Sequence, residues 1–443
     1  MQFAKRGQAS LTVCSTAFVG LGKAQARALG FPELPIAVIP HPFGSRTRDE
    51  IRELANQCVQ DIARLVAGAD TGSRDSAGTG RNSGAAADPG GGPPSARATF
   101  VEAPDDLEEL NAFFRERRWT DGMPVIPPTP GRVQRMLEHT GRRPDEVVAT
   151  LAPGFGAATV EKIAVNAVLA GCDPAHLPVL IAAVEAIASP EFNLQGIQCT
   201  TNAVAVWLIV NGPVAEKLQV NGGLNCLGQG ASANATLGRA LHLVMQNVGR
   251  AVPGEMDRAT QGQPGKYSLC CAENEAASPW PALHLDRGFA ADESTVTVAG
   301  IAGTINMNTH AKDAADVLRV IADTMAHAPS NDYWAGGEPW IMLSPEHADI
   351  LQREGLSKAD VQRALWEQSK MPARRMAARD FARTQQARRD ELGEIGPDTL
   401  LPISRRPEDI GIVVAGGPGT HSVYLPSFGD THSVTRAIQG RRT

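Results

Sequence analysis

Apolar residues recur along this chain with two spacings, and each spacing predicts a different element. The helical spacing i, i+3, i+4, i+7 is followed by Val160, Ile163, Ala164 and Ala167. The run Ala203–Val210 (AVAVWLIV) is apolar at every position, which predicts a strand buried on both faces. Helical and strand patterns alternate along the chain, and this alternation is typical of an α/β protein.

Residues 1–68 predict a small βαβα unit. Strands are expected at Ser10–Val13 and Pro35–Pro40, with a helix between them that ends at Gly30 and a second helix over Asp49–Val66. Two strands are too few for a stable parallel sheet. We therefore expect this unit to dock on something or to be a remnant of a larger domain.

The rest of the chain divides by composition. Residues 69–99 are rich in Gly, Ala, Ser, Pro and Asp and contain almost nothing to bury, so we expect a flexible linker. A large mixed α/β main domain is expected over residues 100–330 and a C-terminal α/β section over residues 331–443. Within the main domain, the polar stretches Asn193–Asn202 and Thr304–His310 are predicted as loops, with Thr309 capping a helix over Ala311–His327.

The stretch Asn221–Met245 joins a glycine loop to an amphipathic helix that begins at Ser232 or Asn234. The loop contains Cys226 together with Gly222, Gly223, Gly228 and Gly230. Glycines let backbone N–H groups approach a ligand, and a helix N-terminus favours an anion or a thiolate. The stretch is therefore either an anion site with an activated cysteine or a tight turn around a buried one. Arg239 would either reach the anion or form a surface ion pair.

Residues 253–289 form a long segment without a regular period. Such a segment in a compact domain is more often functional than not, which makes Lys266, Cys270 and Glu273 candidates. A strand over Tyr267–Ala272 would place Cys270 and Cys271 on opposite faces.

Other candidates come from the ends of predicted elements. Cys172 precedes a helix that Asp173 is expected to cap, where it is either activated by the helix dipole or packed as a small apolar residue. The remaining substrate-binding or catalytic candidates are Asn306, Asn308, His310, Gly417 and His421, in polar loops that follow predicted strands.

Composition excludes several classes of protein. The net charge of −6 and 5% aromatic content argue against nucleic-acid binding, and no apolar run reaches the roughly 18 residues that would span a membrane. Seven cysteines in 443 residues do not suggest a disulfide scaffold and fit a reducing compartment. We expect a cytoplasmic protein that acts on a small molecule as a homo-oligomer, with no nucleic-acid or membrane partner. The sequence identifies no cofactor.

The segment VCSTAFVGLGKAQARALGFPELPIAVIPHPFG resembles the C-terminal half of the UGSC-type (seleno)protein family domain. That family is named for a U/C-G-S-C redox motif upstream of this segment. The motif is absent from this sequence, so its residues cannot be assigned here and the unit is expected to be a truncated UGSC-like one. The resemblance implies a thiol-redox ancestry. The blocks DGMPVIPPT, TVEKIAVNAV and GKYSLCCAENE resemble large bacterial α/β proteins that co-occur with UGSC-like domains, which implies architecture but no chemistry.

Three functions remain open. The first is a cysteine-centred enzyme that uses Cys172, Cys226 or Cys270 on a small anionic organic substrate, with Lys266, Glu273 or His310 as proton carriers. The second is a metal- or iron–sulfur-dependent lyase, for which the candidate ligands are Cys172, Cys199, Cys226 and Cys270. The third is a non-catalytic oligomeric binding protein.

Overall fold

The computed structural model describes residues 6, 8, 10–43, 46–66, 98–328 and 330–440. The predicted linker lies almost entirely outside the described residues. In the part of the chain that is described, no single helix has the length and apolar character needed to cross a membrane, although the bent pair Pro174–Ile187 and Pro190–Cys199 passes on length and composition alone.

The N-terminal unit has the predicted βαβα order. Strand β1 (Thr12–Ser15) pairs in parallel with β2 (Ile36–Ile39), and helices α2 (Val19–Ala28) and α3 (Arg48–Val66) follow the two strands. The connection between parallel strands requires a crossover, and α2 supplies it.

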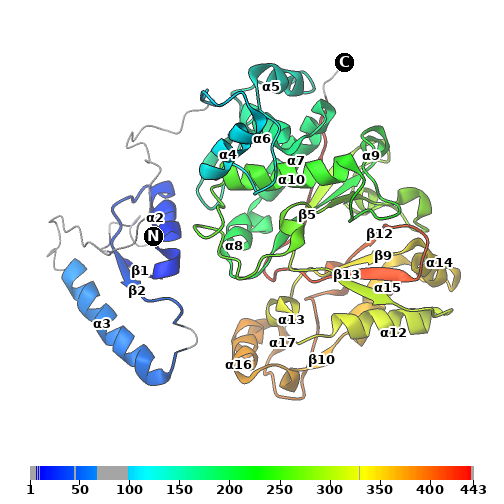
Figure 1. The fold of residues 1–443 in the computed structure, drawn as a ribbon. Helices are drawn as coiled ribbons and strands as arrows, with labels where there is room; N and C mark the ends of the chain where they lie inside the picture. The colour runs from blue at the N-terminus through cyan, green and yellow to red at the C-terminus, as the bar shows by residue number, and fades with distance from the viewer. Residues whose placement is uncertain are drawn as a thin grey trace.

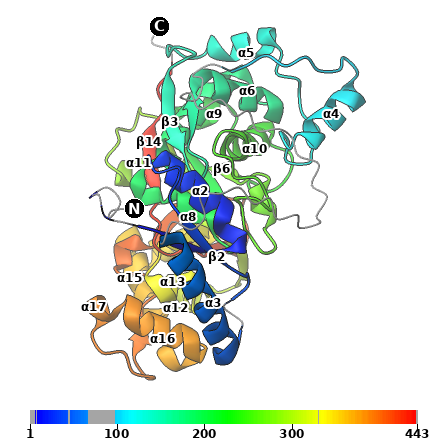
Figure 2. The same cartoon turned by 90° about the vertical axis from the view of Figure 1, so that its left-hand side faces the viewer.

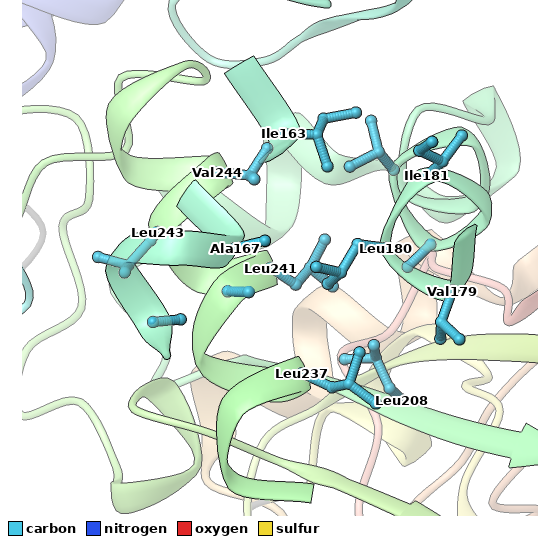
Figure 3. Close-up of a cluster of buried hydrophobic side chains, with 14 of the residues drawn as sticks. Ile163, Ala167, Val179, Leu180, Ile181, Leu208, Leu237, Leu241, Leu243 and Val244 are labelled. Carbon is cyan, nitrogen blue, oxygen red and sulfur yellow. The ribbon is translucent and has the colours of Figure 1, made fainter. Parts of the chain in front are cut away.

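The first sheet of the main body contains β5 (Ala205–Asn211) at its centre. Its strand order is β14-β7-β5-β6, with β6 over Cys270–Ala272, β7 over Thr295–Ile301 and β14 over Val434–Ala437. Helices α6 (Val160–Ala170), α7 (Leu177–Ile187) and α10 (Ser232–Asn247) cover one face (Figure 1). Figure 3 shows Leu237, Leu241 and Val244 of α10 packed among side chains of α6, α7 and β5. This apolar cluster fixes the position of α10 on the sheet.

The second sheet has the strand order β12-β9-β13-β8. Its strands are β8 (Ile305–Asn308), β9 (Trp340–Leu343), β12 (Gly411–Val414) and β13 (His421–Leu425). Its outer face packs on α12 (Ala314–Met325), α14 (Pro345–Arg353) and α15 (Lys358–Gln368).

The two sheets meet across a third apolar cluster. Trp207 of β5 and Trp340 of β9 contact edge to face, with 5.6 Å between ring centroids. Because side chains alternate along a strand, Val206 and Leu208 face the helices while Trp207 faces the second sheet. The body therefore has four layers: helices, sheet, sheet and helices (Figure 1).

Shorter elements complete the body. They are α4 (Leu107–Glu116), α5 (Pro130–Leu137), β3 (Val147–Leu151), β4 (Gly156–Thr159), α8 (Leu194–Cys199), α9 (Pro213–Lys217), α11 (Leu283–Asp286), α13 (Asn331–Ala335), β10 (Met371–Pro372), α16 (Ala378–Ala387), α17 (Arg389–Leu392) and β11 (Leu400–Leu401).

Predicted helix boundaries hold where the sequence supplies a cap. Thr159 accepts a hydrogen bond from the amide of Lys162, and Gly171 ends α6 with a φ of 86°. The side chain of Asp173 likewise accepts from the amide of Ala175.

Three local predictions are wrong. Asn193–Asn202 contains helix α8, which the side chain of Asn193 caps by accepting from the amide of Gly196. Thr304–His310 contains strand β8, because its polar side chains alternate with Ile305 and Met307 along the edge of the second sheet. Helix α12 begins after Asp313, whose carboxylate accepts from the amide of Asp316, so Thr309 is not its cap.

Candidate active site

A cavity of about 850 Å³ opens beside α10. Its walls come from the end of α4, the loop after it, α8, α10 and the segment 251–267. The polar side chains that line it are Arg115, Arg118, Thr120, Asp121, Gln198, His242, Gln246, Asp257, Gln261, Gln263, Lys266 and Tyr267. A concave site with several convergent polar groups is where a small-molecule site is expected. The first half of the long aperiodic segment thus lines this cavity.

His242 is one of the lining residues of this cavity, and one of its ring nitrogens lacks a hydrogen-bond partner. Its Nδ1 lies 2.8 Å from the carbonyl oxygen of Gly238, one turn back on α10, so Nδ1 carries the proton and donates it. Its Nε2 is buried and has no hydrogen-bond partner among the described residues. Burial, with a smaller contribution from the charge of Lys266, lowers the pKa of His242 to about 4. The ring is therefore neutral at pH 7, and the lone pair of its buried Nε2 is unpaired.

Lys266 and Asp257 form an ion pair at the same cavity. The Nζ of Lys266 lies 2.5 Å from an Asp257 carboxylate oxygen, and the Asp257 side chain is only 7% exposed. Residues 264–266 form a short 3-10 turn that brings the lysine back toward Asp257. The pair supplies the cavity with a fixed cation beside a neutral histidine.

Asp121 is held in the wall by Arg239. The guanidinium donates to both carboxylate oxygens, at 2.7 and 2.9 Å, and also to the carbonyl oxygen of Pro124 at 2.8 Å. Burial opposes ionisation of Asp121, but the hydrogen bonds and charge of Arg239 outweigh it and hold the pKa of Asp121 below its usual value. Arg239 therefore fastens the loop after α4 to α10.

The glycine loop lies elsewhere, with Leu224 exposed and Cys226 buried in the cluster between the two sheets. Gly222 packs against the backbone of Ala272 and Glu273, and its carbonyl oxygen accepts from the amide of Gly416 at 2.8 Å. Other amides of the loop are bonded within it: Gly223 donates to the side chain of Asn221 and Gly228 to the carbonyl oxygen of Asn225. Gly230 has a φ of 119°, which favours glycine.

Cys226 of this loop and Cys271 of β6 are both buried. Both side chains belong to the cluster between the sheets and both are free thiols. The hydrogen bond from Cys271, together with the nearby amides of Leu227 and Gly416, lowers the pKa of Cys226 below its ordinary value. The same contact and burial raise the pKa of Cys271.

The other cysteines are packed as apolar residues. Cys270 and Cys271 point to opposite faces of the sheet, as predicted, so Cys270 lies in the cluster with the helices. Burial raises the pKa of Cys270, and it raises that of Cys172 and Cys199 to about 12. Cys172 donates to the carbonyl oxygen of Thr236 at 3.3 Å.

The four cysteines of the metal hypothesis are not brought together. Among the described residues, no three His, Cys, Asp or Glu side chains are placed to hold a metal ion. Cys226 lies between the sheets while Cys172 and Cys270 lie on the helix side, so the sheet itself separates them.

The candidates near the second sheet form a separate group. Asn306 and His421 face each other on β8 and β13, with 3.1 Å between the Asn306 amide nitrogen and His421 Nδ1. Asn308 is the register partner of His421, and Gly417 packs against Leu224 of the glycine loop. His310 is exposed. These side chains lie outside the lining of the cavity beside α10.

Glu273 is buried away from the cavity. It accepts hydrogen bonds from the side chain of Asn211 at 2.6 Å and from the amide of Leu283 at 2.7 Å. Burial raises its pKa. These contacts indicate a structural role in joining β5 to α11.

A second cavity, of about 920 Å³, is largely apolar. Its lining includes Phe113, Phe114 and Trp119 with three prolines of the segment 127–130. It contains none of the residues that the sequence singled out.

Sequence reasoning missed Asp121, His242 and Cys271 as site residues. A signal existed for His242, because Arg239 and His242 are three residues apart on the polar side of a helix and so share a face. No local signal pairs Cys226 with Cys271, which are joined only by the packing of the two sheets.

Comparison with known proteins finds a family match for the N-terminal unit. Residues 1–68 match the model of the UGSC family, which confirms the resemblance seen there. The rest of the chain has no family assignment. No curated protein and no solved structure matches the chain.

Proposed function

We propose that this protein is an enzyme that binds a small organic anion in the cavity beside α10 and transfers a proton to or from it. The observation that carries the proposal is the buried, unpartnered Nε2 of His242, a residue that lines the same cavity as the Lys266–Asp257 ion pair. A histidine acceptor beside a fixed cation is an arrangement suited to general base catalysis with stabilisation of a developing negative charge.

The charges of the lining favour an anion. The cations Arg115, Arg118 and Lys266 line the cavity against the carboxylates Asp121 and Asp257. Arg239 further offsets Asp121 from behind the wall. A carboxylate substrate would be attracted by Arg115 and Lys266, whereas Arg118 is already paired with Glu255 at 2.5 Å.

Substrate binding would also prepare the base. In the free protein, burial and the charge of Lys266 keep the pKa of His242 at about 4, too low for efficient proton abstraction. An anion placed at Lys266 would offset that positive charge, which is the lesser of the two effects, and so raise the pKa of His242. His242 would then take a proton from the substrate, and Lys266 would stabilise the resulting anion. Elimination and hydration reactions of small hydroxy acids have this requirement.

Proton exchange in D₂O tests the proposal. A panel of small hydroxy- and oxocarboxylates is incubated with the protein, and loss of carbon-bound proton signals or product formation is followed by NMR. His242→Asn, which can still donate to Gly238, should slow exchange by about 10²–10⁴-fold. The double variant Lys266→Met with Asp257→Asn should do the same without leaving a buried carboxylate unpaired.

The matched control is His310→Asn, because His310 is exposed and outside the cavity lining. It should exchange at the wild-type rate. Wild-type rates in the His242 and Lys266 variants, with the fold intact by circular dichroism, would refute the proposal.

Thiol chemistry on the same class of substrate is a second candidate, favoured by the lowered pKa of Cys226 in the cluster between the sheets. Cys226 does not line the cavity. Cys226→Ser therefore separates the two candidates: unchanged proton exchange assigns turnover to the cavity, and its loss in a folded variant assigns it to the thiol.

A further inference from the structure

We propose that the second cavity, of about 920 Å³, binds a neutral aromatic alcohol. Its walls come from the segment 98–105, from α4, α5 and α6, and from Asn247 at the end of α10. Figures 1 and 2 both show α4, α5 and α6 at the end of the body that lies away from the second sheet. A cavity of this size is within the range that small-molecule ligands occupy.

The lining is suited to aromatic rings. Phe113, Phe114 and Trp119 all line the cavity and contact one another edge to face, with 5.8 to 6.1 Å between ring centroids. A further aromatic ring packs favourably against such a cluster. Phe100 and Val101 also line the cavity although they are 87% and 52% exposed. Exposed apolar side chains beside a cavity are typical of a binding site for an apolar ligand.

The charges of this lining disfavour an anion. Its ionisable side chains are Asp105, Glu161 and Arg132, so carboxylates outnumber cations, which is the opposite of the first cavity. Arg132 already donates to the carbonyl oxygen of Pro127 at 3.1 Å, and Glu161 accepts from the amide of Ala98 at 3.1 Å. A neutral ligand therefore fits this lining better than a carboxylate does.

Asn247 is the lining residue that selects a hydroxyl group. Its Nδ2 donates to Asn166 Oδ1 at 2.7 Å and to the carbonyl oxygen of Trp119 at 3.1 Å, so both amide protons are used. Its Oδ1 is buried and has no hydrogen-bond partner among the described residues. An unpaired buried acceptor costs free energy, and a ligand O–H group would satisfy it. An aromatic alcohol thus matches both the ring cluster and the acceptor.

Binding here would affect the first cavity, a consequence that rests on the proposed function. Trp119 lines the second cavity, whereas its neighbours Arg118 and Thr120 line the first. Two adjacent residues of α10 hold this segment. Gln246 donates to the carbonyl oxygens of Arg118 and Thr120, both at 3.0 Å, and Asn247 donates to that of Trp119. A ligand that shifts Trp119 would therefore also shift two residues of the first cavity.

Equilibrium dialysis of the full chain tests the site without any substrate. Three probes share one ring system: β-naphthol carries a hydroxyl group, its methyl ether lacks the donor, and β-naphthoate is an anion. One β-naphthol should bind per chain, about three- to tenfold more tightly than the methyl ether, although the ether is the more apolar probe. Any binding of β-naphthoate should be independent of the second cavity.

Variants locate the site. Val165 of α6 is half-buried and lines the cavity, so Val165→Phe should occupy the space and weaken β-naphthol binding at least about tenfold, without affecting β-naphthoate. Asn247→Leu should abolish the preference for β-naphthol over its methyl ether. The matched control is Gln246→Leu, which loses hydrogen bonds to the same segment but does not alter the lining of the second cavity. It should retain that preference.

Three results would overturn the proposal. They are no saturable binding of β-naphthol, equal or tighter binding of the methyl ether by the wild type, and wild-type binding of β-naphthol by a folded Val165→Phe. If that variant does not fold, the comparison of the two neutral probes on the wild type and on Gln246→Leu still decides. Saturating β-naphthol should change the rate of substrate proton exchange about fivefold or more in the wild type and not in Val165→Phe. Failure of that coupling alone would leave the binding site standing.

Discussion

Arg239 donates two hydrogen bonds to the carboxylate of Asp121, although the two residues are 118 positions apart in the chain. Both side chains are almost buried, at 13% and 11% exposure. The pair connects the loop after α4 to α10 and so forms one wall of the cavity. Loss of either partner would leave the other charge buried.

Arg239→Met should therefore lower the free energy of unfolding by about 3–5 kcal/mol, measured by urea denaturation. The exposed pair Arg319–Asp316 provides the control, and Arg319→Met should change it by less than about 1 kcal/mol. Equal effects of the two substitutions would show that the Asp121 pair is not stabilising. Combining Arg239→Met with Asp121→Asn should recover part of the loss.

Gly222 and Gly223 are neighbours with different surroundings. A Cβ at Gly222 would lie 2.7 Å from the carbonyl oxygen of Ala272, whereas at Gly223 the nearest atom is a side-chain oxygen of Asn221 at 3.4 Å. Gly222→Ala should destabilise the protein by about 1–3 kcal/mol because backbone must move. Gly223→Ala should have little effect. Thermal and urea unfolding of the two variants compare them directly, and a reversed order would contradict the placement of the loop.

His242 makes stability depend on pH. Its pKa is 6.5 in an ordinary setting and about 4 in the folded protein. As pH falls from 6.5 toward 4, His242 becomes protonated in the unfolded chain but stays neutral in the folded protein. The free energy of unfolding therefore falls, by about 3 kcal/mol in total. In His242→Asn this contribution should vanish. An unchanged pH profile in the variant would show that the ring is not buried as described.

Asp332 acts in the opposite direction over an overlapping range. It is fully buried, and burial raises its pKa from 3.8 to about 6, although Ser330, Tyr424 and Ser427 all donate to it. The unfolded chain loses its proton first, so stability falls as pH rises from 3.8 to 6. The size is about 3 kcal/mol.

Asp332→Asn should remove this slope, because the amide can accept at one oxygen and donate to the hydroxyl of Ser427. Since the two contributions oppose each other, the wild-type profile between pH 4 and 6 should be flatter than that of either variant. Urea unfolding at half-unit pH steps measures all three. A variant profile that matches the wild type would contradict the corresponding burial.

Much of the architecture follows from local sequence. The βαβα order of residues 1–68, the strand at β5 and the caps at Thr159 and Asp173 all depend on short-range periodicity or capping chemistry. The split of Cys270 and Cys271 between two faces also needs only the period of a strand. The helix α8 and the edge strand β8 were missed although each has a local signal, the Asn193 cap and the alternation of Ile305 and Met307 with polar residues.

The candidate site also combines features that the sequence shows with features that only the tertiary structure shows. The sequence by itself marked the glycine loop with Cys226, and marked Lys266 within a long aperiodic segment, because glycine, cysteine and lysine have chemistry that is visible residue by residue. Only the tertiary structure placed Lys266 and His242 in one cavity lining, Asp121 against Arg239, and Cys226 and Cys271 in one buried cluster. These pairs depend on which helices and sheets pack together, and that packing arises from nonlocal burial of apolar faces, a property that no single segment of the chain contains.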